Sequence, residues 1–284
     1  MNRTEFRNLA QHGLLLDGAT GSNLYAAGMP RGIPSEDWIL EHPDVLTDLQ
    51  RRYRAAGSRM VIAPTFTVSR VYRHAPVAEL NRRLAALSKA AVPDCLIAGD
   101  VTTVARPDLP YEEMLDNYSE QIAALADAGC DVILIETMMG LPETTAALEA
   151  AHAVCDLPVL CSFSVSADGM LYFGGSVLEA AQTLEALEAD AVGVNCSCGP
   201  DQLESVIRNL REAVSLPILA KPNAGMPQIQ DDGSAVYPVT PEAFAAEMKK
   251  LIAAGATVVG GCCGTTPAHI AALAAVLEEA RHEL

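Results

Sequence analysis

Aromatic and basic side chains are scarce in this chain of 284 residues. Phe, Trp and Tyr make up 5% of it, so the core has to be built mainly from aliphatic side chains. Lys and Arg number 19 against 36 Asp and Glu, which gives a formal net charge of −17. Because such a surface repels phosphate backbones and anionic lipid, we expect neither a nucleic acid nor a membrane among its partners.

Long apolar runs are also missing. No stretch approaches the roughly 20 apolar residues of a membrane-spanning helix, and the start, MNRTEFRNL, lacks the apolar segment of a signal peptide. Eight cysteines without a regular framework are typical of reduced thiols in the cytoplasm. We therefore expect a soluble, cytoplasmic protein.

Short apolar runs alternate with segments of helical periodicity along the chain. Several runs are continuous, as in parallel strands that are covered on both faces. There are eight strand–helix units, and eight is the number that closes a parallel barrel. We predict a single-domain (β/α)8 TIM barrel over residues 1–284, with an open doubly wound sheet as the alternative. The predicted strands are 13–17, 59–65, 95–101, 131–136, 158–165, 191–196, 217–221 and 256–261.

Three cysteines stand at the ends of predicted strands. Cys262 and Cys263 lie in Gly-Gly-Cys-Cys-Gly (260–264), and Cys196 ends an earlier apolar run. Strand ends of a barrel converge on one mouth. Zinc with three protein ligands and one open position is a catalytic arrangement. The spacing therefore predicts a Zn²⁺ site formed by these three thiolates.

Each part of this zinc hypothesis has an alternative. Cys262 and Cys263 could form a vicinal disulfide, although that bond is strained and disfavoured in a reducing compartment. Cys198 could replace Cys196 as the third ligand, but Cys196 ends its strand directly. We interpret the four remaining cysteines, Cys95, Cys130, Cys155 and Cys161, as small buried hydrophobic residues.

Two acids are predicted at the same mouth. Asp17 opens a glycine-rich turn whose backbone amides could hold a small anion, with a carboxylate favoured over a phosphate. Glu136 ends the run Ile-Leu-Ile-Glu, where a carboxylate is costly unless it is paired with a ligand ammonium or with a Lys or Arg of the barrel. Lys221 ends the seventh predicted strand, and either an ion pair or a Schiff base could use it. Two acids and backbone donors suit the α-amino and α-carboxylate groups of an amino acid.

Five motifs together resemble the zinc-dependent homocysteine S-methyltransferase family, with the closest likeness to the homocysteine-binding barrel of cobalamin-dependent methionine synthase. The resemblance covers nearly the whole chain, in the same order. The motifs are LLLDGATG (14–21), ILIET (133–137), GVNCS (193–197), KPNAGMP (221–227) and GGCCGTTPAHI (260–270).

The resemblance implies a function and a set of site residues. Zinc would be held by Cys196, Cys262 and Cys263, and the sulfur of homocysteine would take the fourth position and be methylated to give methionine. No further catalytic residue is implied. The implied substrate contacts are made by Asp17 and Glu136 to the amino group, by the turn Gly18, Ala19 and Thr20 to the carboxylate, and by Asn195 beside the metal.

Two departures from the family pattern concern the methyl donor. Ala-Pro-Thr-Phe (63–66) stands where the family often has Thr-Asn-Thr-Phe, and Asp100-Val-Thr-Thr-Val stands where relatives tend to carry Gly-Pro-Thr-Gly. Both face the predicted mouth. We also expect no separate folate or corrinoid domain, so the methyl group would come from outside the chain.

Three further hypotheses remain open. The leading donor is a methylated corrinoid (methylcobalamin) on a partner protein, and S-methylmethionine or a betaine-type donor is the alternative. The chain could instead be a non-catalytic homocysteine- or zinc-binding subunit of a methyltransferase complex. A lyase that uses Lys221 is the third hypothesis.

Overall fold

Eight parallel strands form the centre of the computed structural model, which describes residues 1–73, 76–231 and 233–283. Their order in the sheet is β1-β10-β7-β6-β5-β4-β3-β2. The amide of Arg59, just before β2, donates to the carbonyl of Leu15 in β1 at 2.9 Å, so the two edge strands meet and the sheet nearly closes. The strands are β1 (Leu14–Leu15), β2 (Met60–Ile62), β3 (Leu96–Thr102), β4 (Val132–Met138), β5 (Val159–Phe163), β6 (Ala191–Cys196), β7 (Ile218–Pro222) and β10 (Ala256–Val259).

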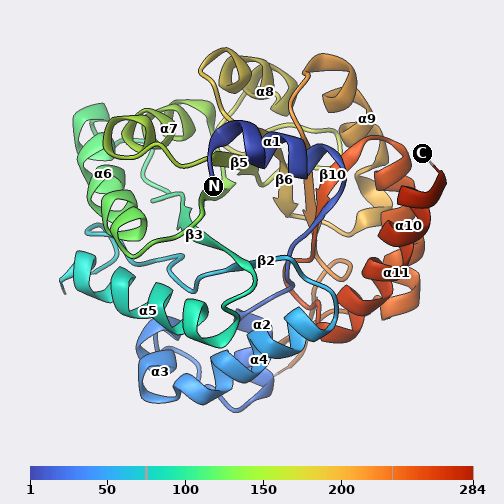
Figure 1. The fold of residues 1–284 in the computed structure, drawn as a ribbon, viewed down its shortest axis with the longest axis horizontal. Coiled ribbons are helices and arrows are strands. Elements are labelled where there is room, and N and C mark those ends of the chain that lie inside the picture. The colour runs from blue at the N-terminus through green and yellow to red at the C-terminus, as the bar shows by residue number, and fades with distance from the viewer. Residues whose placement is uncertain (74–75, 232, 284) are drawn as a thin grey trace.

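Helices surround this barrel, as Figure 1 shows. The predicted (β/α)8 barrel is confirmed, and the doubly wound alternative is wrong because the strands close around a common interior. Within the described residues, no helix is both long and apolar enough to cross a membrane. The outer helices are α4 (Pro43–Ala55), α5 (Val77–Ala91), α6 (Tyr111–Asp127), α7 (Leu141–Val154), α8 (Val177–Ala186), α9 (Glu204–Ala213), α10 (Pro241–Ala253) and α11 (Pro267–Glu283).

The barrel interior is a separate aliphatic core. Alternate strand residues point inward, and Leu134, Leu160 and Leu219 meet there with Met60 and Val258. The other residues of each strand pack outward against the helices in a larger core. The scarcity of aromatic residues thus goes with a core made largely of aliphatic side chains.

Helix α1 (Arg3–Gln11) covers the end of the barrel where the strands begin. Asn2 and Glu5 form a capping box that fixes the start of this helix. Phe6 is fully buried in the barrel interior, and the Arg3 guanidinium pairs with Asp190 at 2.9 Å. The sequence analysis did not predict this helix, which closes the barrel floor.

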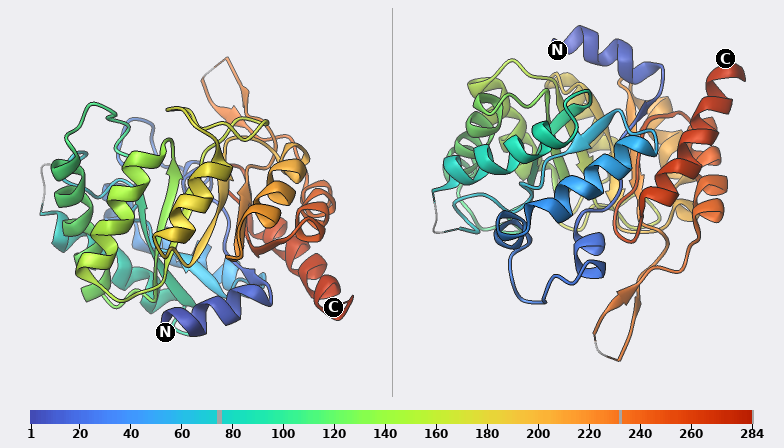
Figure 2. Two further views of the ribbon diagram at one scale, coloured as in Figure 1. Left: turned by 90° about the horizontal axis from the view of Figure 1, so that it is seen from above. Right: turned by 60° about the horizontal axis from the view of Figure 1, so that its bottom comes forward.

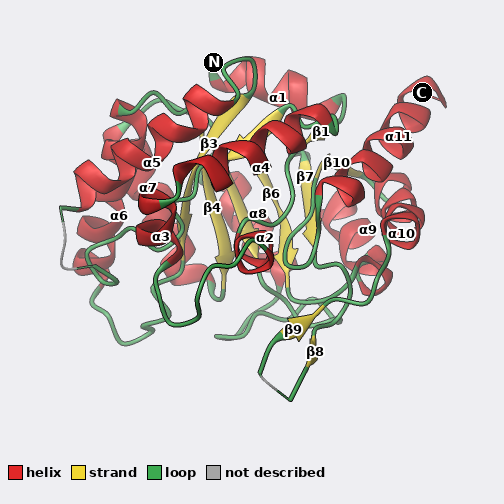
Figure 3. Ribbon diagram, turned by 90° about the horizontal axis from the view of Figure 1, so that it is seen from below, coloured by secondary structure: helices red, strands yellow, loops and turns green. Residues whose placement is uncertain are grey.

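The opposite end of the barrel carries the longer loops. The first loop contains α2 (Gly21–Ala26) and α3 (Ser35–Glu41), and the loop after β7 forms a hairpin of β8 (Gln228–Ile229) and β9 (Ala235–Val236). Figures 2 and 3 show this hairpin projecting on the side opposite α1. Residues 74–75 and 232, in the segments that follow β2 and β7, lie outside the described residues.

Candidate metal centre and acceptor site

A cavity of about 370 Å³ lies at the end of the barrel where the strands finish. It is lined by residues of the turn after β1, of α3 and of the ends of β3, β4, β6 and β7. Its lining includes Gly18, Ala19, Thr20, Asp100, Glu136, Cys196, Lys221, Cys262 and Cys263.

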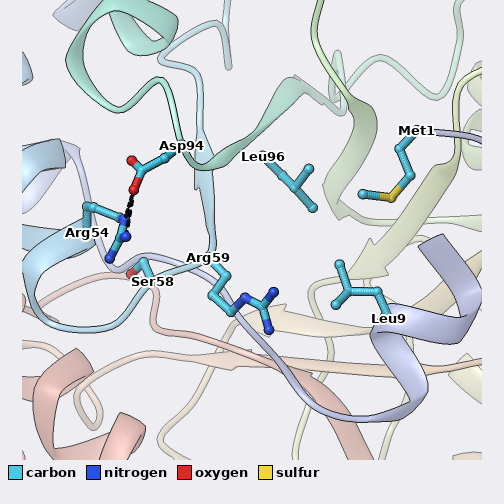
Figure 4. Close-up of a pocket in the computed structure, with 7 residues that line it drawn as sticks. All are labelled: Met1, Leu9, Arg54, Ser58, Arg59, Asp94 and Leu96. Atoms are coloured by element: carbon cyan, nitrogen blue, oxygen red, sulfur yellow. Dashed lines mark hydrogen bonds and ion pairs between the residues drawn. The ribbon is translucent and has the colours of Figure 1, made fainter. Parts of the chain in front are cut away.

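A second cavity, of about 480 Å³, lies at the other end beside α1 (Figure 4). Leu9, Arg59 and Leu96 line it together with Asp94, whose carboxylate is already paired with Arg54 at 2.6 Å. This cavity therefore has no free acid among its lining residues, and it includes none of the three cysteines. The three cysteines line the first cavity instead.

The three predicted cysteines come together there. Their sulfur atoms all lie within 4.8 Å of one another, and the Sγ atoms of Cys196 and Cys263 are 4.0 Å apart. Tetrahedral zinc with Zn–S bonds of about 2.3 Å places two ligand sulfurs about 3.8 Å apart. The donor set and its spacing therefore fit zinc, and all three cysteines line the cavity.

The alternatives for these cysteines are resolved by the geometry. Cys262 and Cys263 are free thiols, so the vicinal disulfide is not present. Cys198 is buried and lies outside the cluster, because the chain turns away after Cys196. Cys95, Cys130 and Cys161 are free and buried, as interpreted, whereas Cys155 is half-buried.

The backbone at Cys196 is bent into an unusual conformation. Cys196 and Ser197 have φ values of 58° and 65°, which non-glycine residues seldom adopt. The Ser197 hydroxyl accepts a hydrogen bond from the amide of Val165 at 2.8 Å and is 2.8 Å from the Ser164 hydroxyl. These bonds from the end of β5 hold a turn that costs about 1–3 kcal/mol per residue, and the turn carries the Cys196 thiol toward its partners.

The Cys262–Cys263 turn is fixed by neighbouring loops. The amide of Cys262 donates to the carbonyl of Pro222 at 2.8 Å, and Ala224 donates to the carbonyl of Cys263 at 2.9 Å. Gly264 follows with a φ of 80°, and the ring of Tyr237 lies where a side chain at this position would stand. Glycine is needed here for both reasons.

Protons are unevenly shared within the cysteine cluster. Hydrogen bonds from the thiols of Cys196 and Cys262 lower the pKa of Cys263 to about 3, despite its burial. Donating these hydrogen bonds, together with burial, raises the pKa of Cys196. One thiolate stabilised by two thiols is a suitable precursor for a thiolate-binding cation.

The turn after β1 is tied directly to this cluster by Thr265. Its hydroxyl accepts from the amide of Ala19 at 3.0 Å and donates to the carbonyl of Cys262 at 2.7 Å. A side chain at Gly18 would collide with that hydroxyl and with Tyr53, whose own hydroxyl donates to Ala19 at 2.7 Å. The glycine-rich turn and the cysteines therefore form one rigid unit.

Asp17, at the base of this turn, is only partly satisfied. Its Oδ2 accepts from the amide of Ile62 at 3.0 Å, while Oδ1 is buried without a hydrogen-bond partner. Burial raises the pKa of Asp17 to about 7. A buried carboxyl oxygen without a partner is costly, and a ligand donor would satisfy it.

Glu136 has a partner within the barrel. The Nζ of Lys221 lies 2.7 Å from its Oε2, and both side chains are less than a tenth exposed. Burial works against a charged lysine, but the negative charges around it, Glu136 first and then Cys262, Asp17 and Asp100, together raise the pKa of Lys221. The ion-pair interpretation of Lys221 is confirmed; a Schiff base would need this amine neutral.

Asn195 is buried below the cysteine cluster. Its Oδ1 accepts from the amide of Thr137 and from the Ser162 hydroxyl, both at 2.8 Å, and its Nδ2 donates to Thr137 Oγ1 at 2.7 Å. Asn195 thereby fixes Thr137, whose φ is 60° and which lines the cavity. That Asn195 itself contacts substrate stays a prediction.

Asp100 also lies at the cavity, although it was not predicted as a site residue from the sequence. It lines the cavity, is 4% exposed, and its Oδ1 has no hydrogen-bond partner. The sequence signal was available, because Asp100 follows the run Leu-Ile-Ala-Gly just as Glu136 follows Ile-Leu-Ile. In the sequence, Asp100 stood out only as a departure from the family pattern.

Comparisons with known proteins agree with this fold and identify a family. Residues 14–277 match the homocysteine S-methyltransferase family. The methionine synthases of Mycobacterium leprae and Mycobacterium tuberculosis are each 31% identical over 95% of the chain. The chain spans about a quarter of the length of these two relatives, 24% and 25%.

Solved structures show the same barrel. The metallated form of the homocysteine methyltransferase MmuM from Escherichia coli superimposes with a TM-score of 0.82 at 24% identity, covering 96% of this chain and 99% of that one. Its apo form gives a TM-score of 0.77 at 25% identity, covering 94% and 96%. The chain belongs to the homocysteine S-methyltransferase family, and it carries a three-cysteine cluster that fits zinc.

Proposed function

We propose that this chain methylates the sulfur of homocysteine, giving methionine, with the thiol bound at a zinc ion held by Cys196, Cys262 and Cys263. The observation that carries the proposal is the spacing of the three sulfurs at the edge of the cavity. When bound, zinc supplies a positive charge that removes the thiol proton at neutral pH, where a free thiol with a pKa of about 8.5 is mostly protonated.

The chain's own residues would position the rest of the acceptor. Asp17 and Glu136 are the acids predicted to attract its ammonium group; Oδ1 of Asp17 has no hydrogen-bond partner, whereas Glu136 is already paired with Lys221. The turn formed by Gly18, Ala19 and Thr20 would take its carboxylate through its other backbone donors, because the Ala19 amide already donates to Thr265, a bond that fixes the turn. Asn195 would orient Thr137 against the substrate.

The methyl donor has to approach from the open mouth. We favour a methylated corrinoid on a partner protein, which is supported by the relationship to methionine synthases of which this chain matches about a quarter. S-methylmethionine or a betaine-type donor is the alternative. A donor must present its methyl group in line with the acceptor sulfur, so the cavity should bind acceptor and methyl group together.

The test is an anaerobic methyl-transfer assay with the zinc-loaded protein, homocysteine and one donor at a time. Methionine formed from a methylcobalamin donor supports the leading version. Methionine formed from S-methylmethionine without any corrinoid would replace it by the alternative. Tight binding of zinc and homocysteine without turnover on any donor would instead identify a non-catalytic binding subunit.

A further inference from the structure

We propose that Asp100 is a substrate-recognition residue that, together with Asp17, binds the ammonium group of the acceptor, while Lys221 holds Glu136 in an ion pair. This inference rests on the proposed function, because it concerns how the same cavity recognises the acceptor. It predicts a site specific for thiols that carry a protonated amine.

The alternation of the barrel strands places Asp100 in a polar layer at the mouth. Ala98, Leu134 and Leu219 point into the apolar interior. The residues two positions farther along their strands are Asp100, Glu136 and Lys221, and a period of two keeps them on the same inner face. All three line the cavity, so these side chains form its floor.

The hydrogen bonding of this layer is incomplete. Glu136 and Lys221 satisfy each other at 2.7 Å. Among the described residues, Asp100 Oδ1 and Asp17 Oδ1 are buried carboxyl oxygens without a partner. Leaving such an oxygen unpaired costs about 1–3 kcal/mol, so two of them near one cavity indicate a missing donor.

The charge balance indicates that this donor is a cation. Lys221 is the one cationic side chain among the described residues that line the cavity, and Glu136 is its partner. Asp17 and Asp100 also feel the charge of Lys221, but neither has an ion-pair partner among the described residues. Burial, followed by the charge of Glu136, raises the pKa of Asp100 well above its usual range, which is the electrostatic cost that an incoming ammonium group would remove.

The ion pair with Lys221 also determines which acid can bind the ammonium group of a ligand. In the absence of Lys221, Glu136 would be a free carboxylate at the mouth and the natural ammonium partner. With Lys221 present, a ligand ammonium at Glu136 would have to share that carboxylate with a second cation in a buried site, and like charges at close range repel strongly. Lys221 acts on Asp100 and Asp17 through its charge, but among the described residues no cation is paired with either acid. The ammonium group is therefore expected beside Asp100 and Asp17.

The experiment compares two thiols on the zinc-loaded protein by anaerobic titration calorimetry. Homocysteine carries the amine, and 4-mercaptobutanoate is the same chain without it. Asp100→Asn keeps the shape of the side chain and removes its charge. We expect it to weaken homocysteine binding roughly 10- to 100-fold, the range for a charge-assisted hydrogen bond, and to change the dissociation constant of 4-mercaptobutanoate less than about threefold.

Two further variants keep the result interpretable. Asp168→Asn removes one charge from an exposed acid on the loop after β5 and should leave both dissociation constants unchanged. The double variant Glu136→Gln with Lys221→Met removes the ion pair without leaving a buried charge, and it should weaken homocysteine binding less than Asp100→Asn does. Zinc content and thermal unfolding verify that each variant is folded and loaded.

The outcomes separate this inference from the proposed function. An Asp100→Asn protein that binds homocysteine as tightly as wild type, or that loses both thiols equally, would overturn the role of Asp100 while leaving zinc-dependent thiol binding intact. A larger loss in the Glu136 and Lys221 double variant than in Asp100→Asn would also overturn it, because Glu136 would then be the ammonium partner. Failure of the wild-type zinc protein to bind either thiol would contradict the proposed function itself.

Discussion

The ammonium group of Lys221 lies 2.7 Å from Oε2 of Glu136, and the two side chains are 5% and 8% exposed. Burial takes both charges out of water, so each depends on the other for its stability. Both residues line the cavity at the ends of the strands, and in our proposal the pair makes Glu136 unavailable to the ligand.

Removal of Lys221 alone should destabilise the fold. Lys221→Met leaves Glu136 buried without a counter-charge, and breaking a buried pair in this way costs about 3–5 kcal/mol of unfolding free energy. Adding Glu136→Gln should recover most of that loss. Urea unfolding of the wild type, both single variants and the double variant gives the coupling energy, and additive losses would contradict the pairing.

Zinc binding should depend on three cysteines and not on their buried neighbour. Cys196→Ala, Cys262→Ala and Cys263→Ala each leave two thiolates, so we expect weak or substoichiometric zinc after dialysis. Cys198→Ala is the matched control and should retain one zinc per chain, because Cys198 lies outside the cluster. Metal analysis of the purified proteins decides this, and normal zinc in a Cys196→Ala, Cys262→Ala protein would refute the assigned ligands.

The burial of Asp17 should make the metal-free protein less stable as the pH rises. The folded-state pKa of Asp17 is raised to about 7 from an ordinary value of 3.8, so the folded state binds the proton more tightly than the unfolded state. Between these values the free energy of unfolding therefore falls with increasing pH. Between about pH 5.5 and pH 7, the ionisation of Asp17 lowers the free energy of unfolding by an amount on the order of 2 kcal/mol.

Asp17→Asn isolates this contribution. The variant cannot ionise at position 17, so its stability relative to wild type should increase from about pH 5.5 to about pH 8. Denaturant unfolding at both pH values measures the difference between the two proteins. A constant difference across this range would show that Asp17 ionises normally in the folded protein.

Thr265 should couple the glycine-rich turn to the cysteines. Thr265→Val keeps the shape but removes the hydroxyl that bonds Ala19 and the carbonyl of Cys262, leaving a buried amide without its acceptor. We expect a loss of about 1–3 kcal/mol in unfolding free energy and weaker binding of both homocysteine and 4-mercaptobutanoate, since both carry the carboxylate that the turn would hold. Unchanged binding of both thiols would mean that the turn does not contact the carboxylate.

Much of the barrel could be predicted from sequence because two features indicate a strand: a continuous apolar run and a short turn before it. Runs such as Val132 to Ile135 are continuously apolar, and terse turns precede them. The predicted bounds of the first strand (13–17) and the second (59–65) are wider than the observed strands, because apolar residues continue into loops that still pack on the core. Helix α1 was missed because it buries only Phe6 and Ala10, too few to give a clear helical period.

The site was predictable where topology alone brings residues together. Strand ends of a barrel converge, so the three cysteines could be grouped without coordinates. The partners of the charged residues depend on register and side-chain direction, which the sequence does not give. Glu136 in β4 pairs with Lys221 in β7, although β5 and β6 lie between these two strands in the sheet, so the sequence could not show whether Glu136 meets Lys221 or a ligand. Asp100 could be recognised only as an unusual residue near the end of a strand.

The central claim is that the three cysteines hold a zinc ion whose fourth position accepts the homocysteine sulfur. Zinc-edge X-ray absorption of the loaded protein, before and after addition of homocysteine, tests it most directly. We expect three sulfur neighbours at about 2.3 Å and one lighter atom, changing to four sulfur neighbours when homocysteine is added. A zinc environment that does not change with saturating homocysteine, or one that already holds four protein sulfurs, would contradict the account.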